Sequence, residues 1–194
     1  MRTCFAALAA FVALTTMACT SQPHDQPAEA RGDVIAEMSS SEPRAALNDA
    51  TIVAIFDAAN TADIETGRLA VERGTTKEIR DFGAMLAHDH RIVRQQGRDL
   101  AEQLGVTPTP PADDASAMAH ADVMARLRAT QGADFDKAFL DHEVRFHEDV
   151  INAVRTTLLP AIENGEVKAF VVNVVPAFDA HRIAAETLRK KLGT

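Results

Sequence analysis

The chain has 194 residues, of which 28 are acidic and 20 are basic, so its formal net charge at pH 7 is −8. This balance argues against nucleic acid and anionic lipid headgroups as partners, because both bind a basic face. Trp and Tyr are absent, which removes the usual stacking platforms for bases and sugars. The length suits one domain with a sizeable core.

The N-terminus carries the pattern of an export signal. Arg2 is followed by an apolar run that ends at Ala18–Cys19, and a basic start, an apolar stretch and a small residue are typical of secretory signals. The segment resembles the lipobox of bacterial lipoproteins, with Thr16 in place of the usual leucine. We therefore expect a lipoprotein-type signal peptide over residues 1–18 and lipidation of Cys19. Simple secretion, with Cys19 unmodified, is the alternative.

This signal indicates the cell envelope. An acyl group on Cys19 would make the membrane a partner through the lipid anchor. Thr20 after the cysteine predicts sorting to the outer membrane, with the protein facing the periplasm; without lipidation it would be periplasmic or secreted. The sequence does not indicate a protein partner.

Two regions of different composition follow the signal. Residues 19–46 are rich in Pro, Ser, Gln and acidic residues and show no sustained apolar period, which indicates a disordered tether. Residues 47–194 carry apolar residues at spacings of three and four, the pattern of amphipathic helices. Stop signals place four long helices from Asn48 to Gly74, from Thr75 to Gly105, from about residue 135 to Pro160 and from about residue 167 to Gly193, with a short helix over about 117–129.

These elements predict an all-α fold, a ferritin-like up-and-down four-helix bundle with one extra short helix. No segment alternates with period two for long enough to predict a sheet. Thr75 and Glu78 have the spacing of a capping box, with Thr75 as the N-cap of the second long helix. Pro176 lies inside the fourth apolar stripe and predicts a kink there.

Three of the seven histidines fall on core-facing helical positions. His90 and His181 lie in the stripes of the second and fourth long helices, and His147 lies on the inner side of the third. His147 and His181 are equally far from the turn at Asn164, so the constant rise of a helix puts them at the same height. Glu143 is one turn before His147 and shares its face.

Counting from the turn near Gly74 brings Asp57 to about the height of His90. Imidazole and carboxylate ligands suit transition metals, so the layer is a candidate site for Cu, Zn or Fe. A hydrogen-bonded network without metal is the alternative, because buried polar groups need partners. The expected layer contains His90, His147, His181, Glu143 and Asp57.

Signatures of common catalytic sites are missing from the sequence. It contains no Gly-rich phosphate loop, no Gly-x-Ser-x-Gly and no His-Glu-x-x-His. It also lacks the Glu-x-x-His of di-iron carboxylate bundles. We therefore expect no catalytic residue. Two functions stay open: an envelope-tethered metal-binding protein, or a non-catalytic structural or stress-related interaction domain with a hydrogen-bonded histidine core.

Several residues, taken in order, resemble the DUF4142 family. The resemblance covers about residues 48–192 and implies a bacterial envelope protein with a ferritin-like bundle and no established activity. It also implies that His90, His147 and His181 occupy family positions. The residues that carry it are Glu65-Thr-Gly-Arg-Leu-Ala70, Met85 with Asp89–His90, Phe135–Asp136, His147, and Pro176 five residues before His181.

Overall fold

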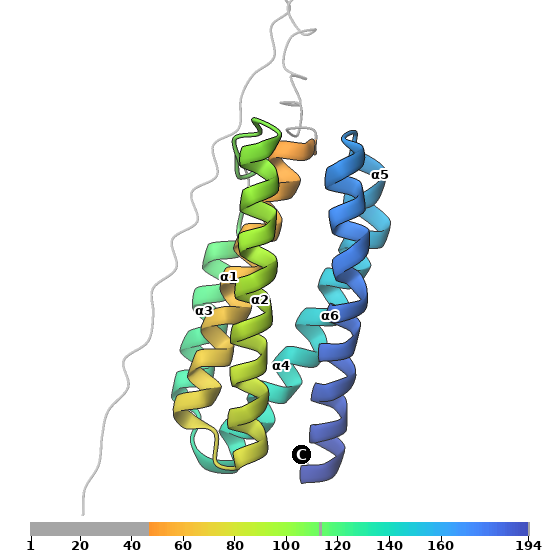
Figure 1. Ribbon diagram of the computed structural model, residues 1–194. Coiled ribbons are helices and arrows are strands. Elements are labelled where there is room, and N and C mark those ends of the chain that lie inside the picture. Colours follow the sequence, from red (N-terminus) through yellow and green to blue (C-terminus); the bar gives the residue numbers. More distant parts are fainter. Residues whose placement is uncertain (1–46, 113, 194) are drawn as a thin grey trace, which may run out of the picture. The chain divides into compact units, whose positions relative to one another are not determined.

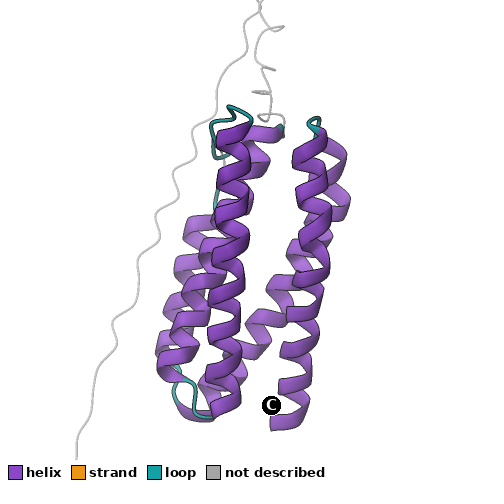
Figure 2. Ribbon diagram, viewed as in Figure 1, coloured by secondary structure: helices purple, strands orange, loops and turns teal. Residues whose placement is uncertain are grey.

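The computed structural model describes residues 47–112 and 114–193, which form helices and connecting loops without any strand (Figure 2). The all-α prediction is therefore confirmed. The expected signal peptide (1–18), Cys19 and the expected tether (19–46) lie outside the described residues. The elements are α1 (Asp49–Arg73), α2 (Lys77–Gln103), α3 (Ser116–Ala129), α4 (Gly132–Ala153), a π-helical turn (Val154–Leu158), α5 (Leu159–Ala161) and α6 (Gly165–Leu192).

The four long helices α1, α2, α4 and α6 form the bundle (Figure 1). α1 and α6 run in one direction and α2 and α4 in the other, because α3 carries the chain back along the bundle before α4 begins. At one end, Asp49 of α1 accepts hydrogen bonds from the backbone N–H groups of Glu163 and Asn164, just before α6. One long crossover of this kind is typical of ferritin-like bundles. The short helix expected over residues 117–129 is that crossover.

The start of α2 differs from the predicted capping box by one residue. Thr76 is the N-cap, and its side chain accepts the backbone N–H three residues on. The backbone N–H and hydroxyl of Thr75 instead donate to the carboxylate of Asp136 on α4. Glu78 pairs with Lys191 at the end of α6, at 2.8 Å. The prediction of Thr75 as the cap was wrong because a tertiary partner takes its side chain.

A polar layer divides the bundle interior into two apolar clusters. On every long helix, buried polar residues lie between two apolar stretches: residues 60–66 of α1, His90 of α2, residues 143–147 of α4 and His181 of α6. Two sets of apolar side chains pack on either side of this layer. One includes Ile52, Phe56, Val154, Val167, Val171 and Phe178, and the other Leu69, Ile79, Phe82, Leu86, Phe135 and Phe139.

α1 and α2 approach closely where two glycines face each other. A Cβ atom on Gly67 would lie 2.6 Å from the backbone oxygen of Gly83, and one on Gly83 would lie 2.5 Å from that of Gly67. Neither position has room for a side chain. Gly67 is one turn after Asp63, so this contact also holds the α1 part of the polar layer against α2.

Two prolines, Pro160 and Pro176, lie in the part of the chain that includes α5 and α6. Before Pro160 the chain widens into the π-helical turn, in which the N–H of Leu159 donates to the carbonyl of Val154. This wider turn accommodates a residue that has no N–H to donate. Pro176 lies within α6, on its exposed side. None of the described helices combines the length and apolar character needed to cross a membrane.

Candidate metal centre

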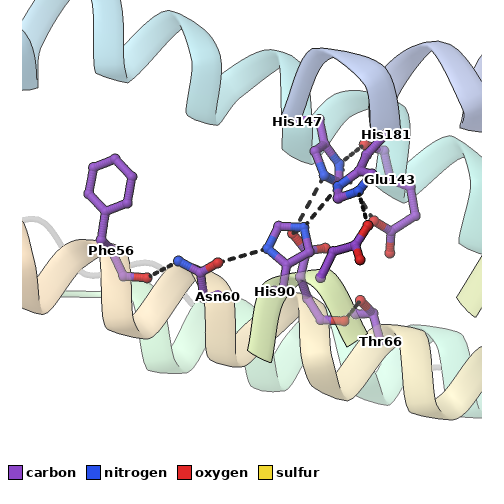
Figure 3. Close-up of polar contacts among 9 residues, drawn as sticks. Phe56, Asn60, Thr66, His90, Glu143, His147 and His181 are labelled. Atoms are coloured by element: carbon purple, nitrogen blue, oxygen red, sulfur yellow. Dashed lines mark hydrogen bonds and ion pairs between the residues drawn. The ribbon is translucent and has the colours of Figure 1, made fainter. Parts of the chain in front are cut away.

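His90 from α2, His147 from α4 and His181 from α6 meet inside the bundle (Figure 3). Their exposed fractions are only 2%, 1% and 4%. Each offers a ring nitrogen, and these nitrogens lie within 4.8 Å of one another. The structure thus brings together the three inward histidines that helical spacing had selected.

Asn60 orients the ring of His90 by a hydrogen bond with its outer nitrogen, Nδ1, which faces away from the other two histidines. The Asn60 side-chain nitrogen donates to the carbonyl of Phe56 at 2.7 Å, which fixes the orientation of the amide. Its oxygen therefore faces Nδ1 of His90, at 2.9 Å, and can only accept (Figure 3). Nδ1 of His90 carries the hydrogen atom, and Nε2 presents a lone pair to the interior.

The other two histidines follow the same arrangement. Nδ1 of His147 donates to the backbone carbonyl of Glu143 at 2.9 Å, and Nε2 of His181 donates to the carboxylate of Asp89 at 3.0 Å. The opposite ring nitrogens, Nε2 of His147 and Nδ1 of His181, are left as acceptors. Metal-ligating histidines are typically oriented by such outer hydrogen bonds to carbonyl or carboxylate oxygens.

The inward atoms are separated by distances expected of ligands that share an ion. Nε2 of His90 lies 3.2 Å from Nδ1 of His181. Oδ2 of Asp63 lies 3.1 Å from Nε2 of His90 and 3.6 Å from Nε2 of His147. Four ligands placed tetrahedrally about 2 Å from an ion lie about 3.3 Å apart. The three imidazole nitrogens form one group within 4.8 Å, and His147, Asp63 and Glu143 form a second. The layer therefore holds nitrogen and oxygen donors of the right type, and the three distances given above are close to the tetrahedral value.

Burial keeps the imidazoles of His90 and His147 neutral. It lowers the pKa of His90 to about 2, and the neighbouring rings of His147 and His181 act in the same direction. It also lowers the pKa of His147 to about 4. Neutral imidazole is the form that binds metal ions, so these two rings are ready to act as ligands at neutral pH.

Two carboxyl groups complete the layer. Asp63 is 1% exposed and Glu143 is fully buried. In the described part of the chain no N–H group donates to their carboxyl oxygens, but the two carboxyl groups interact with each other, and Thr66 lies beside Glu143. Burial raises the pKa of Asp63 well above its usual value, and nearby Glu143 raises it further. Burial also raises the pKa of Glu143 to about 7. Both groups therefore favour a proton or another cation.

The side chains of the layer are almost fully buried. A small pocket lies beside it, and this pocket has no room for a water molecule. Catalytic metal sites keep a coordination position open for water or substrate, whereas structural sites are closed. The geometry therefore fits the holding of an ion better than chemistry on a substrate. Residues that line the pocket include Asn60, Asp63, His90, Phe146, His147 and Phe178.

Asp57, expected in the layer, lies outside it. Its carboxylate accepts from the guanidinium groups of Arg94 and Arg98, with Nε–Oδ1 distances of 3.0 and 2.5 Å. Asn60 and Asp63 supply the polar groups of α1 in its place. Asn60 and Asp63 follow Phe56 by four and seven residues, so all three lie on the same face of α1. Their spacing from this apolar residue could therefore have identified them in the sequence.

Within the described residues, three other histidines lie away from the centre. Besides Asn60 and Asp63, sequence reasoning also missed Asp89, which supports the centre. His88 is exposed and His142 is partly buried. His120 on α3 contacts Glu65 at 2.8 Å. Asp89, which holds His181, was noted only as part of a family motif. Asp89 reaches His181 only because α2 packs against α6. The spacing of residues within one helix does not predict such a contact.

The fold and the site define a ferritin-like four-helix bundle with a buried layer of three histidines and two carboxyl groups. The chain belongs to the DUF4142 family: the family model, described as a domain of unknown function, matches residues 35–188. The match begins within the stretch expected to be a tether. No curated protein matches the chain.

Solved structures of CopM share this fold. CopM in the Cu(II)-bound form is 12% identical, with a TM-score of 0.57 over 75% of this chain and 98% of that chain. The apo form is 13% identical, with a TM-score of 0.58 over the same shares. The Cu(I)-bound form is 13% identical, with a TM-score of 0.56 over 74% and 96%. At this identity the likeness establishes the fold alone.

Proposed function

We propose that this protein binds one transition-metal ion, copper foremost, with His90, His147, His181 and Asp63 as ligands. The observation that carries the proposal is which ring nitrogen of each histidine donates a hydrogen bond. The outer nitrogen of each histidine donates to an oxygen, so three lone pairs converge at ligand spacing. A cation is the partner that such an arrangement lacks.

A hydrogen-bonded core accounts less well for the same residues. Among the described residues, Nε2 of His147 is buried without a hydrogen-bond partner, and no N–H group donates to the carboxyl groups of Asp63 and Glu143. Each unpaired buried group costs about 1–3 kcal/mol. A proton on Asp63 could be donated to only one imidazole lone pair, at Nε2 of His90 or of His147, and would leave the others without a donor. An ion among them removes both problems.

The donor set favours copper among the candidate metals. Imidazole nitrogen suits Cu, Zn, Fe and Ni, and copper binds most tightly among the divalent ions of the first row. CopM, which shares the fold, has been solved in Cu(II)-bound and Cu(I)-bound forms, and this supports the choice. The closed layer favours binding or buffering of the ion over catalysis. The N-terminal sequence pattern supports a place in the cell envelope, anchored through Cys19.

Elemental analysis of the chain, purified without a histidine tag, tests the proposal. We expect one equivalent of metal after exposure to Cu, and weaker binding of Zn, Fe or Ni. His147→Ala and His181→Ala should each abolish tight binding. His88→Ala removes an exposed histidine of α2 and is the matched control, expected to bind as the wild type does. A wild type that binds none of the four metals would contradict the proposal and favour the hydrogen-bonded histidine core.

A further inference from the structure

A second cavity lies towards the end of the bundle where α1 begins, and it shares Asn60 with the wall of the pocket beside the metal centre. Its volume is about 260 Å³, and it is open on one side. α1, α2, α6 and the loop after α2 surround it, and the residues that line it include Ile52, Phe56, Val93, Pro110, Phe170 and Val171. The cavity wall is thus mainly aliphatic and aromatic.

The cavity is large enough for a small organic molecule. An apolar cavity of about 150 Å³ in a protein interior accepts benzene, so this one has room for a larger apolar body, of about eight carbon atoms. Gly97 of α2 helps to keep it open. A Cβ atom at that position would lie 3.3 Å from the ring of Phe170.

The cavity also has a charged rim. Arg94 and Arg98 both pair with the single carboxylate of Asp57. No other carboxylate pairs with either arginine in the described residues. The three side chains therefore carry one net positive charge, on a chain whose overall formal charge is −8. The Arg98 side chain is 49% exposed, so its guanidinium can reach a ligand at the rim.

We propose that this cavity binds an amphiphile with a short apolar body and one anionic headgroup, such as a medium-chain carboxylate. The body fills the space beside Gly97 and Phe170. The headgroup lies at the rim, where it pairs with the guanidinium groups that Asp57 neutralises only in part. A few charged groups beside a mainly apolar wall are typical of small-molecule sites. The proposal does not depend on metal binding.

Calorimetric titration of the full chain with octanoate and with octanol tests this site. Ala58 lines the cavity, so Ala58→Leu fills part of it and should abolish binding of both probes. Arg98→Gln should weaken octanoate at least fivefold and leave octanol unchanged, because only octanoate carries the charge. Arg91→Gln is the matched control: Arg91 is exposed on the same helix and does not line the cavity.

Three results would overturn the proposal. The first is a wild type that does not bind octanoate. The second is an equal loss of octanoate affinity in Arg98→Gln and Arg91→Gln, which would mean that only the overall charge matters. The third is unchanged binding in a folded Ala58→Leu variant, which would place the probe elsewhere. If circular dichroism finds Ala58→Leu unfolded, the comparison of the two arginine variants decides.

Discussion

Nε2 of His90 lies 3.2 Å from Nδ1 of His181, and both nitrogens present lone pairs. A hydrogen bond between them would require one ring to be charged. Burial lowers the pKa of His90 to about 2, which opposes a charge on that ring. The outer partners, Asn60 and Asp89, keep the two rings in these tautomers. If the proposed ion binds between these two nitrogens, the outer hydrogen bonds belong to the site, because they orient both rings.

Asp89→Ala should weaken copper binding by about 10- to 100-fold, the usual cost of losing an outer partner of a metal-ligating histidine. Without the carboxylate, the ring of His181 is free to rotate and to change tautomer. Competition with a chelator of known affinity measures the effect. Asp99→Ala is the control, because Asp99 is an exposed carboxylate of the same helix. Equal affinities in the two variants would mean that Asp89 does not position His181.

Glu143→Gln should stabilise the metal-free protein, and by more at pH 8 than at pH 5. The pKa of Glu143 is raised by burial from 4.5 to about 7, so the folded state keeps its proton over a range in which the unfolded state has lost it. The stability from this group is fully present below about pH 4.5 and is lost as pH rises towards 7. Glutamine does not ionise, so the variant avoids this loss.

Urea denaturation of the metal-free protein at both pH values measures this difference. Glu148→Gln changes an exposed residue of the same helix and should give nearly the same stability as the wild type at each pH. A Glu143→Gln variant whose advantage is the same at pH 5 and pH 8 would show that the carboxyl group ionises normally.

Copper affinity should fall as pH is lowered from 8 to 5, by up to tenfold per unit for each proton that competes with the metal. We expect Asp63 to be the competing group, since burial raises its pKa, whereas burial lowers the pKa of His147 to about 4. Asp63→Asn should bind more weakly at pH 8 and show a flatter profile. A profile as steep as that of the wild type would exclude Asp63 as the group that releases the proton.

Gly67→Ala should destabilise the protein by about 1–3 kcal/mol, the range found for overpacked interiors. The added methyl group would lie 2.6 Å from the backbone oxygen of Gly83, so the two helices must move apart. Gly165→Ala is the matched control, because a Cβ atom there meets nothing within 4 Å. Thermal unfolding followed by circular dichroism compares the two, and equal midpoints would contradict the close approach of α1 and α2.

Cys19→Ala should leave the protein either unprocessed or soluble if Cys19 is the lipidated residue. Membrane fractionation and the mass of the mature protein measure the outcome in a Gram-negative host. A variant that still partitions with membranes and has a normal mature mass would show that lipidation at Cys19 is wrong.

Apolar periodicity was sufficient to predict the helices, and the inward positions of His90, His147 and His181 follow from the same spacing. The residues of α1 were harder to predict. Asp57 and Asp63 are less than two turns apart, and a height counted from a turn does not separate them. Their angular positions around the helix axis distinguish them. Asp63 shares the face of Phe56, whereas Asp57 points to Arg94 and Arg98.

Other features depend on contacts between helices, about which spacing within one helix says nothing. The hydrogen bonds of Thr75 to Asp136 displaced the expected cap. The contact between Gly67 and Gly83 needed the packing of α1 on α2. The tautomers of the histidines depended on Asn60 and Asp89, which are side chains of other helices.

The position of the polar layer between two apolar clusters has a kinetic consequence. An ion in the layer has side chains packed on both sides, so it can leave only when the long helices separate locally. We expect the lifetime of the bound ion to follow the opening rate of the bundle rather than the strength of the ligand bonds alone. Such a protein would exchange its metal slowly and retain it through short periods of scarcity.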